Sequence, residues 1–355
     1  MSHPNSQQNR LSNAEGFPSA AFQEEPTPQD ALTLLEALEL GGFDSAECEN
    51  ARNAERETGY SARIPAHFAK AANACRNDAL WRQVLPAMDE LMESSHFTTN
   101  PLQEQAPPTK KFSPIFLLQK YAGRALMMSA MECSGNCRFC FRRHVRTEFK
   151  SLDLRREHYA EPLFQLAKNV SIREVILSGG DPLTLSNDLF FWLLREFQKI
   201  EHLKQIRVHT RVPIFSPEKI SPNFSEFLKL FSENSTQALY FVLHVNHPDE
   251  LTPEVEEAVA RLRSAGVSLL QQGVLLRGVN DSAEILAELY EKLIRLHVLP
   301  YYLHQLDQVQ GAAHFEVEPA VGREIMKELR ARLPGYAVPR YVREIPGETG
   351  KTPLE

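Results

Sequence analysis

The sequence is poor in cysteine and has no long apolar run. Only five cysteines occur in 355 residues, and three of them lie within eight positions, which is not the dispersed pattern of a disulfide scaffold. No apolar stretch approaches 18 residues, and no apolar run follows a basic N-terminus, so we expect neither a transmembrane helix nor a signal peptide. The cysteine usage indicates a reducing compartment. Together with the lack of a signal peptide and a transmembrane helix, it leads us to expect the protein in the cytoplasm.

An excess of positive charge is also missing. Lysine and arginine number 39 against 46 aspartates and glutamates, for a net charge of −7. Nucleic-acid surfaces need clustered cations to contact phosphates, so we expect no nucleic-acid partner. Hydrophobic residues at 43% and charged residues at 24% are ordinary for a globular protein.

The first third of the chain divides into a polar arm, a helical region and a linker. Residues 1–28 are polar and contain proline, which is typical of a flexible arm. Residues 29–105 form the predicted helical region, where apolar residues recur three and four apart before Gly41 and again over residues 80–91. Four prolines in residues 97–114 indicate a linker.

From residue 106 to residue 355 the pattern changes to strands alternating with helices. The predicted strands cover 124–130, 174–178, 205–210, 238–245, 268–276 and 298–304, and the predicted helices lie near 154–169, 185–199, 222–233, 252–265, 282–297 and 319–333. Six β/α units imply parallel strands with helical crossovers, and a closed barrel would need eight. We therefore predict an α/β fold, a partial (β/α)6 barrel with an N-terminal helical region.

The three clustered cysteines, Cys133, Cys137 and Cys140, predict a metal centre with an open coordination position. Three thiolates on a [4Fe–4S] cluster leave one iron free to bind a ligand. The alternative is a structural zinc site completed by His144, because Cys₃His is a common zinc ligand set. Spacing alone leaves both interpretations open.

Polar residues collect at the ends of all six predicted strands. They are Cys133, the Ser178–Asp181 segment, Arg211, the group His244, Asn246 and His247, the group Gln271, Gln272 and Arg277, and the pair His304 and Asp307. In barrel-like α/β folds this edge carries the active site. Gly179 and Gly180 predict a close backbone approach to a neighbour or ligand, although a tight turn capped by Asp181 is an equal alternative.

Lys351 stands in the glycine-containing tail Ile-Pro-Gly-Glu-Thr-Gly-Lys. A lysine amine can form a Schiff base with pyridoxal phosphate, and neighbouring glycines let the backbone pass near a flat cofactor. A surface lysine is the ordinary alternative for such a position.

Taken together, these motifs resemble the radical S-adenosylmethionine (SAM) family of lysine 2,3-aminomutases from about Tyr121 to Lys351. The resemblance is carried by Cys-X₃-Cys-X₂-Cys and, in order, by Cys-Arg-Phe-Cys-Phe-Arg-Arg, Leu-Ser-Gly-Gly-Asp, His-Val-Asn-His-Pro, Gln-Gly-Val-Leu-Leu-Arg-Gly-Val-Asn-Asp and Pro-Tyr-Tyr. The resemblance implies a radical SAM core over residues 106–355.

The resemblance also implies a role for each matching residue. Cys133, Cys137 and Cys140 would ligate the [4Fe–4S] cluster; Ser178, Gly179, Gly180, Asp181, His244 and Gln272 would contact SAM; Lys351, Tyr121 and Arg124 would serve pyridoxal phosphate; and Arg142, Asp307 and Glu344 would bind the substrate. Arg142 would hold the substrate carboxylate in a bidentate pair, and the two acids would hold a distal ammonium. A distal carboxylate would be repelled, so glutamate is a poor substrate candidate.

Two positions depart from the family pattern. Glu344 replaces the usual aspartate, and the glycine run before Lys351 is reduced to Gly-Glu-Thr-Gly. The chain also ends at Glu355 without the extension of the longer clostridial forms, which resembles the short bacterial branch that supplies β-lysine for modification of elongation factor P.

The implied reaction is conversion of L-α-lysine to (R)-β-lysine. A 5′-deoxyadenosyl radical from SAM would abstract hydrogen from the β-carbon of lysine held as a pyridoxal phosphate aldimine, with cluster electrons from a donor such as a flavodoxin. A functional link to an elongation factor P ligase is implied. The alternatives are an aminomutase for another amino acid and, in a different class, a zinc-stabilised interaction module.

Overall fold

A nine-stranded mixed sheet forms the centre of the structure, a computed structural model that describes residues 31–104, 115–144 and 153–355. The strands lie in sequence order, β1 to β9. Strands β2 to β8 run parallel, whereas the outer strands β1 and β9 are antiparallel to their neighbours. The predicted arm over 1–28 lies outside the described residues.

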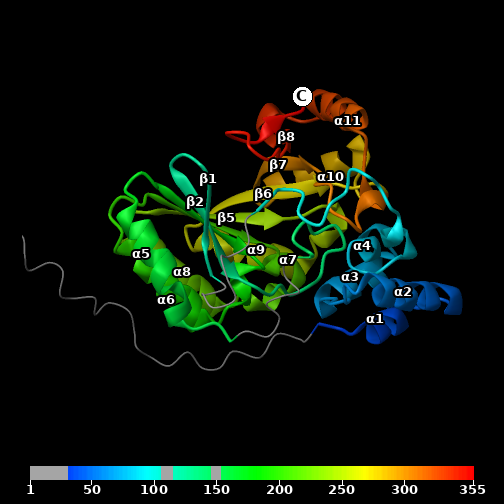
Figure 1. Ribbon diagram of the computed structural model, residues 1–355, viewed down its shortest axis with the longest axis horizontal. Coiled ribbons are helices and arrows are strands. Elements are labelled where there is room, and N and C mark those ends of the chain that lie inside the picture. Colours follow the sequence, from blue (N-terminus) through cyan, green and yellow to red (C-terminus); the bar gives the residue numbers. More distant parts are fainter. Residues whose placement is uncertain (1–30, 105–114, 145–152) are drawn as a thin grey trace, which may run out of the picture.

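The six predicted β/α units are confirmed. Their strands are β2 (Arg124–Ala130), β3 (Glu174–Gly179), β4 (Gln205–Thr210), β5 (Ala238–His244), β6 (Ser268–Leu275) and β7 (Leu299–Gln305), and their helices are α5 (Ala160–Lys168), α6 (Asn187–Gln198), α8 (Pro222–Asn234), α9 (Pro253–Ser264), α10 (Ala283–Arg295) and α11 (Pro319–Arg332). A short helix α7 (Val212–Phe215) follows β4. Figure 1 shows α5, α6 and α8 along the outer side of the sheet.

Three strands were missed from the sequence, and they extend the sheet at both edges. They are β1 (Leu117–Tyr121), β8 (Arg340–Arg343) and β9 (Thr352–Pro353). Two to five residues with polar members carry too little alternation to distinguish a strand from a loop. Because β8 and β9 bring the tail back onto the sheet, they decide where Lys351 lies.

The core is formed by apolar residues that recur at helical spacing on the faces of the helices that cover the sheet. In α10, Leu286, Leu289, Tyr290 and Leu293 are buried, and this i, i+3, i+4, i+7 spacing turns one face of the helix to the sheet. The Ser282 hydroxyl accepts from the Ile285 N–H and starts this helix. On β4, Ile206 and Val208 are fully buried, whereas the alternate residues Arg207 and His209 line the cavity described below.

The N-terminal helical region comprises α1 (Leu34–Gly41), α2 (Ser45–Thr58), α3 (Ala66–Cys75), α4 (Asp78–Arg82) and the 3₁₀ turn η1 (Met88–Leu91). Gly42, with φ of 67°, ends α1 in the left-handed conformation, so the predicted glycine stop is confirmed. The helical pattern expected over 80–91 is confirmed only in part, because α4 ends at Arg82 and a 3₁₀ turn follows from Met88. Pro86 lies between α4 and η1, and proline disfavours helical backbone in the residue before it.

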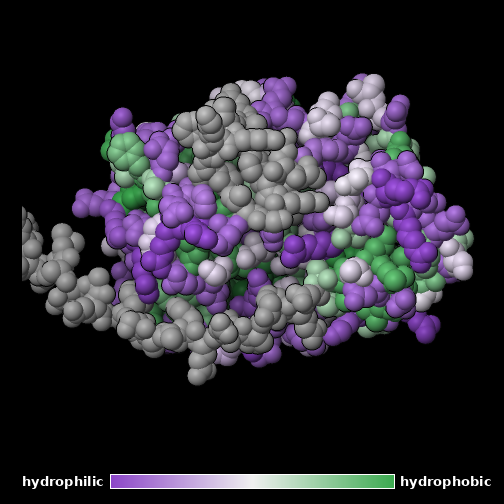
Figure 2. Space-filling model, turned by 60° about the horizontal axis from the view of Figure 1, so that its bottom comes forward, coloured by the Kyte–Doolittle hydropathy of each residue, from purple (hydrophilic) through white to green (hydrophobic). Residues whose placement is uncertain are grey.

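The boundary between the helical region and the core stays a prediction, because residues 105–114 lie outside the described part of the chain. Figure 2 shows hydrophobic surface on the side of the molecule that carries the N-terminal helices, where exposed apolar side chains include Leu35, Leu91 and Met92. No helix within the described residues is both long and apolar enough to cross a lipid bilayer.

Candidate active site

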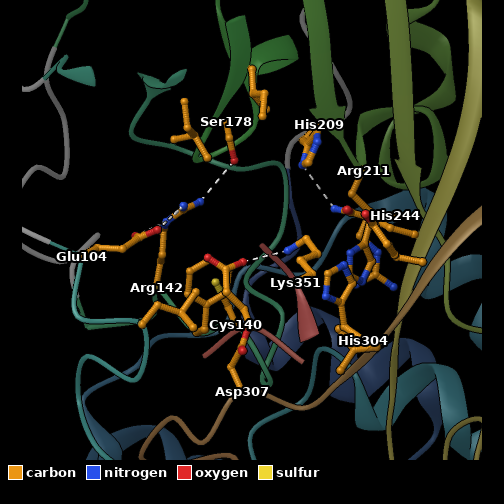
Figure 3. A pocket seen from close by; sticks show the side chains of 18 of the residues that line it. Glu104, Cys140, Arg142, Ser178, His209, Arg211, His244, His304, Asp307 and Lys351 are labelled. Carbon is orange, nitrogen blue, oxygen red and sulfur yellow. Dashed lines mark hydrogen bonds and ion pairs between the residues drawn. The ribbon is translucent and has the colours of Figure 1, made fainter. Parts of the chain in front are cut away.

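A cavity of about 320 Å³ lies at the carboxyl ends of the parallel strands. It is lined by every residue to which the sequence assigned a site role except Gly179: Tyr121, Arg124, Cys133, Cys137, Cys140, Arg142, Ser178, Gly180, Asp181, His244, Gln272, Asp307, Glu344 and Lys351. Figure 3 shows how Arg142, His244, Asp307 and Lys351 converge on it from separate elements. The assigned roles themselves stay predictions.

The three cysteines lie on the loop after β2, and their half-buried thiols line the cavity. Arg211 donates from Nη1 to Cys137 Sγ at 2.9 Å. Thiolates are the ligands of iron–sulfur clusters, and cluster sulfurs accept such N–H bonds, so these residues fit the group. In the described part of the chain, no three His, Cys, Asp or Glu side chains converge closely enough to hold a single metal ion.

His144, the fourth ligand of the zinc alternative, does not line this cavity. Its Nε2 lies 3.0 Å from the carbonyl oxygen of Gln310. The imidazole is therefore engaged with the segment after β7 instead of completing a set with the cysteines.

The two glycines after β3 make room for the chain's own backbone. A Cβ on Gly179, whose φ is +113°, would lie 2.5 Å from the Ala130 oxygen, and one on Gly180 would collide with Glu132. Gly180 N–H donates to the Ala130 oxygen at 2.6 Å, and Asp181 N–H donates to the Glu132 oxygen at 2.7 Å. The close approach expected from the sequence is thus to the segment leading into the cysteine loop.

Asp181 uses its carboxylate to join strand ends. The carboxylate accepts from Thr210 Oγ1 at 2.7 Å and from the backbone N–H groups of Arg211, Val212 and Leu183 at 2.6, 3.1 and 3.0 Å. The capping interpretation of this residue is therefore correct. By holding the start of the segment after β4, Asp181 also orients Arg211 towards the cysteine loop.

Three histidines that line the cavity each have a ring nitrogen without a hydrogen-bond partner among the described residues. The Nε2 atoms of His209, His244 and His304 are buried and have no hydrogen-bond partner among the described residues. Burial lowers the pKa of His304 to about 3 and those of His209 and His244 well below the usual value. His244 also stacks on Phe139, with ring centroids 5.6 Å apart. Buried polar atoms without partners at a cavity are available to a ligand.

His209 was not singled out from the sequence, although it stands one residue before the end of β4 and obeys the same strand-end rule. Its Nδ1 lies 3.4 Å from Gln272 Nε2. This contact links the predicted SAM residue Gln272 to the neighbouring strand.

A row of alternating charges crosses the cavity. Arg142 pairs with Glu104 at 2.7 Å, Glu104 with Lys120 at 3.5 Å, Lys120 with Glu344 at 2.9 Å, and Glu344 with Lys351 at 2.7 Å. Burial acts to raise the pKa of Glu344, but the charges and hydrogen bonds of Lys351 and Lys120 bring it down to about 2. Glu104 and Lys120 had no sequence signature, because they lie in the proline-containing linker and in the missed strand β1.

Asp307 faces the same cavity without a countercharge in contact. Its carboxylate has no hydrogen bond or ion pair within the described residues, and burial, reinforced by the charge of Glu344, raises its pKa to about 7. A partly buried carboxylate of this kind is stabilised by a cation that enters the site.

Lys351 is drawn into the cavity by pairing of the C-terminal strands. Val342 opposes Pro353 and Arg343 opposes Thr352 in the β8–β9 ladder, so the residue before β9 lies beside the end of β8. Its ammonium lies 5.7 Å from the ring centroid of Tyr302. Lys351 is accordingly a cavity lysine and not the surface lysine of the alternative interpretation.

Cationic groups near Lys351 suit an anionic, flat cofactor. Arg124 stacks over the Tyr121 ring at 5.0 Å, and the buried Nε of Arg207 has no partner among the described residues. A phosphate needs N–H donors and positive charge, and an amine beside them can hold an aldehyde. These residues fit pyridoxal phosphate.

Comparison with known proteins agrees with this arrangement. Residues 130–290 match the Radical SAM superfamily. A protein named L-lysine 2,3-aminomutase from Escherichia coli (strain K12) is 38% identical over 339 residues, which cover 93% of this chain and 96% of that protein. Its namesake from Haemophilus influenzae is 38% identical over 327 residues, covering 91% of each chain. The one from Clostridium subterminale is 33% identical over 279 residues, 78% of this chain and 64% of that protein.

Proposed function

This chain belongs to the L-lysine 2,3-aminomutase family of radical SAM enzymes, and on that premise we propose that it converts L-α-lysine to (R)-β-lysine. The observation that carries the proposal is the shared cavity: an arginine, an acidic pair and a lysine amine line the same space as three cysteine thiols. Each end of a lysine molecule then has a group of opposite charge within one site.

The cofactors of the proposed reaction are a [4Fe–4S] cluster on Cys133, Cys137 and Cys140, SAM, and pyridoxal phosphate. When bound, the cluster and SAM supply hydrogen abstraction at an unactivated carbon, and pyridoxal phosphate supplies a π system over which an amino nitrogen migrates. The protein's contribution is to bind, orient and enclose.

Arg142 would bind the substrate α-carboxylate through two parallel N–H bonds. Its side chain is buried, and its Nη1 also donates to Ser178 Oγ at 3.2 Å, so the fork has a defined direction. In the structure this fork holds Glu104, which the substrate carboxylate would have to displace.

Asp307 and Glu344 would receive the side-chain ammonium of lysine. Asp307 has no cation in contact among the described residues, and Glu344, which pairs with Lys351 and Lys120, would lose the Lys351 contact once that amine is committed to pyridoxal phosphate. Two carboxylates close together attract an ammonium and repel a carboxylate, which supports lysine over glutamate as substrate.

Lys351 would hold pyridoxal phosphate, with Arg124 and Arg207 as candidate phosphate partners and Tyr121 beside the ring. Glu344 accepts a hydrogen bond from Lys351 Nζ at 2.7 Å and so holds the amine in the cavity. Glu344 would therefore orient the amine towards the cofactor before it serves in substrate binding.

SAM would lie between the cysteine loop and the strand ends, against His244, Gln272 and the Ser178–Asp181 segment. The unpartnered Nε2 of His244 offers SAM a hydrogen bond, and Phe139 supports the imidazole from behind. Apolar residues such as Leu126, Ile176 and Leu306 line the remaining wall and keep water from the reacting atoms.

The proposal retains three expectations from the sequence: a one-electron donor such as a flavodoxin, action in the cytoplasm, and supply of β-lysine for a ligase that modifies elongation factor P. The high coverage of the shorter relatives supports the likeness to the short bacterial branch.

The decisive experiment is an anaerobic assay of the reconstituted protein with SAM, pyridoxal phosphate, reductant and L-lysine, followed by chiral analysis of the product. We expect (R)-β-lysine. Absence of β-lysine from protein that carries both cofactors would overturn the proposal, and a parallel panel of other amino acids would identify an alternative substrate. Metal analysis that found zinc without iron or sulfide would restore the interaction-module alternative.

A further inference from the structure

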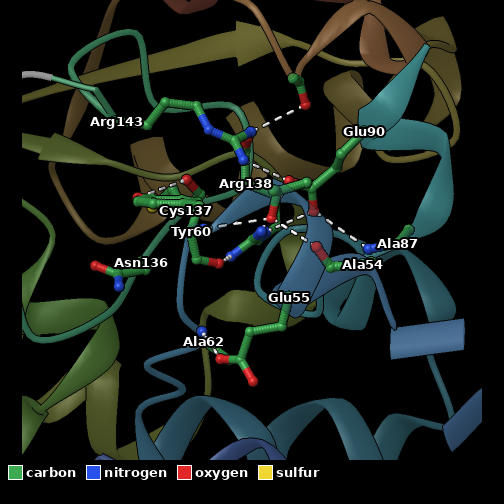
Figure 4. A network of polar contacts seen from close by, with 12 residues as sticks. Ala54, Glu55, Tyr60, Ala62, Ala87, Glu90, Asn136, Cys137, Arg138 and Arg143 are labelled. Carbon is green, nitrogen blue, oxygen red and sulfur yellow. Dashed lines mark hydrogen bonds and ion pairs between the residues drawn. The ribbon is translucent and has the colours of Figure 1, made fainter. Parts of the chain in front are cut away.

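The N-terminal helical region contacts the cysteine loop through a buried network of charged side chains (Figure 4). Glu90, whose side chain is fully buried, pairs with Arg138 at 2.7 Å and with Arg143 at 2.5 Å. Both guanidinium groups lie over the Tyr60 ring, at 4.5 and 4.3 Å. Arg138 and Arg143 stand on either side of Cys140 in the sequence. Their ion pairs with Glu90 therefore connect the cysteine loop to residues that precede the barrel.

Hydrogen bonds to backbone carbonyls also join the cysteine loop to the N-terminal helical region. Arg138 N–H donates to the Gln83 carbonyl and Asn136 N–H to the Arg63 carbonyl, both at 2.9 Å, and Asn136 Nδ2 donates to the Ser61 carbonyl at 2.9 Å. Two backbone N–H groups of the loop that carries the three cysteines are therefore satisfied by the N-terminal helical region.

One side chain of that region reaches Cys137 through a single intermediate. Gln83 is fully buried; its Oε1 accepts from Arg211 Nη2 at 2.6 Å and its Nε2 donates to Glu250 Oε1 at 3.0 Å. Arg211 Nη2 also donates to Glu250 Oε2 at 3.1 Å, and Nη1 donates to Cys137 Sγ at 2.9 Å. The Phe215 ring supports the guanidinium at 4.3 Å.

Glutamine suits this position because it supplies one acceptor and one donor. Its oxygen meets the cationic Arg211 while its amide N–H₂ meets the anionic Glu250, so the planar guanidinium is held on one edge and its other edge is directed at sulfur. A carboxylate at position 83 would lie beside the carboxylate of Glu250 and be repelled by it. An apolar side chain there would leave Arg211 Nη2 with Glu250 as its remaining partner of these two.

We propose that Gln83 is a positioning residue for the iron–sulfur cluster: through Arg211 it fixes an N–H···S contact at Cys137, and so the N-terminal helical region raises the reduction potential of the cluster. A hydrogen bond and a positive charge beside a ligating sulfur stabilise the more negative, reduced state. The inference rests on the cluster of the proposed function, but it does not depend on the substrate or on pyridoxal phosphate.

The test compares cluster-loaded wild type, Gln83→Met and a control, Gln165→Met, which changes an exposed glutamine on α5. Methionine keeps the volume of glutamine and removes the polar contacts of its amide, which include Asn246 Nδ2 at 3.0 Å besides Arg211 and Glu250. Iron and sulfide content verifies loading, and an EPR-monitored redox titration without SAM or lysine gives the midpoint potential. We expect a lower potential in Gln83→Met alone; a tenfold loss of preference for the reduced state is a fall of about 59 mV for one electron. Equal potentials in the loaded variant and wild type would overturn the proposal.

A second measurement decides the case in which Gln83→Met takes up no cluster. Wild type is grown with arginine labelled with ¹⁵N at the guanidinium, and the reduced cluster is examined by HYSCORE spectroscopy. We expect a ¹⁵N coupling that Arg211→Lys abolishes. A wild-type spectrum without the coupling, or a coupling that survives in Arg211→Lys, would overturn the proposal. If no β-lysine forms but the potential and coupling behave as stated, the proposed reaction fails and this inference stands.

Discussion

The guanidinium of Arg142 holds the carboxylate of Glu104 in a bidentate pair, Nε to Oε2 at 2.7 Å and Nη2 to Oε1 at 2.8 Å. This is the geometry with which an arginine binds the carboxylate of an amino acid. A side chain of the protein therefore occupies the position that the proposed function reserves for the substrate carboxylate.

Glu104→Gln should strengthen lysine binding, because the amide competes less well than a carboxylate for Arg142. We expect KM for L-lysine to fall by up to about tenfold, equivalent to about 1.4 kcal/mol, with kcat unchanged. Steady-state kinetics beside Glu93→Gln, an exposed control, measures this. A higher KM in Glu104→Gln would mean that Glu104 orients Arg142 for the substrate instead of competing with it.

Loss of one hydrogen bond to a charged group costs roughly 1.5–3 kcal/mol, which is about 10-fold to 150-fold in affinity. Because Arg142 would form two such bonds, Arg142→Ala should raise KM for L-lysine by more than the loss of one bond would. Arg142→Lys should recover little of this loss, since an ammonium cannot form two parallel bonds. Arg156→Ala, at an exposed ion pair with Asp188, serves as the matched control. Full recovery in Arg142→Lys would exclude bidentate binding.

Lys351→Ala should abolish covalent attachment of pyridoxal phosphate and leave the iron content unchanged. The attachment is measured by borohydride reduction followed by peptide mass analysis, which should find the modification on the peptide with Lys351 in wild type. Modification of another lysine, or loss of iron together with attachment, would contradict the assigned role.

The raised pKa of Asp307 predicts a pH-dependent affinity for lysine. With a pKa of about 7, the carboxyl is mostly neutral below that pH and ionises as the pH rises through it, so attraction for the side-chain ammonium grows in the same direction. KM for L-lysine should fall between about pH 6 and pH 8, and Asp307→Asn should give a higher KM that loses this component. Identical pH profiles in both proteins would remove Asp307 from ammonium recognition.

Glu90→Gln should destabilise the fold, because it leaves Arg138 and Arg143 buried without their anion. Breaking a buried ion pair on one side costs about 3–5 kcal/mol. Denaturant unfolding of the variant beside Glu93→Gln would measure the difference in the free energy of unfolding. A variant as stable as wild type would show that the two arginines find other partners.

The cysteine spacing, the six β/α units and the polar strand ends were all readable from the sequence. These features depend on residues near one another in the chain, where hydrophobic period and spacing of ligands are directly visible. The strand-end rule would also have found His209, which obeys it as His244 does. The helical pattern over 80–91 is interrupted because Pro86 disfavours helical backbone in the residue before it, whatever the apolar spacing.

By itself, then, the sequence determined which reactive side chains the chain carries: three clustered thiols, an arginine, two acids and a lysine. Only the tertiary structure decided which groups meet. The β8–β9 ladder carries Lys351 into the cavity, the linker delivers Glu104 to Arg142, and Gln83 reaches Cys137 through Arg211. Such contacts join segments far apart in sequence, where no local period or motif specifies the partner, and packing around the completed sheet selects them.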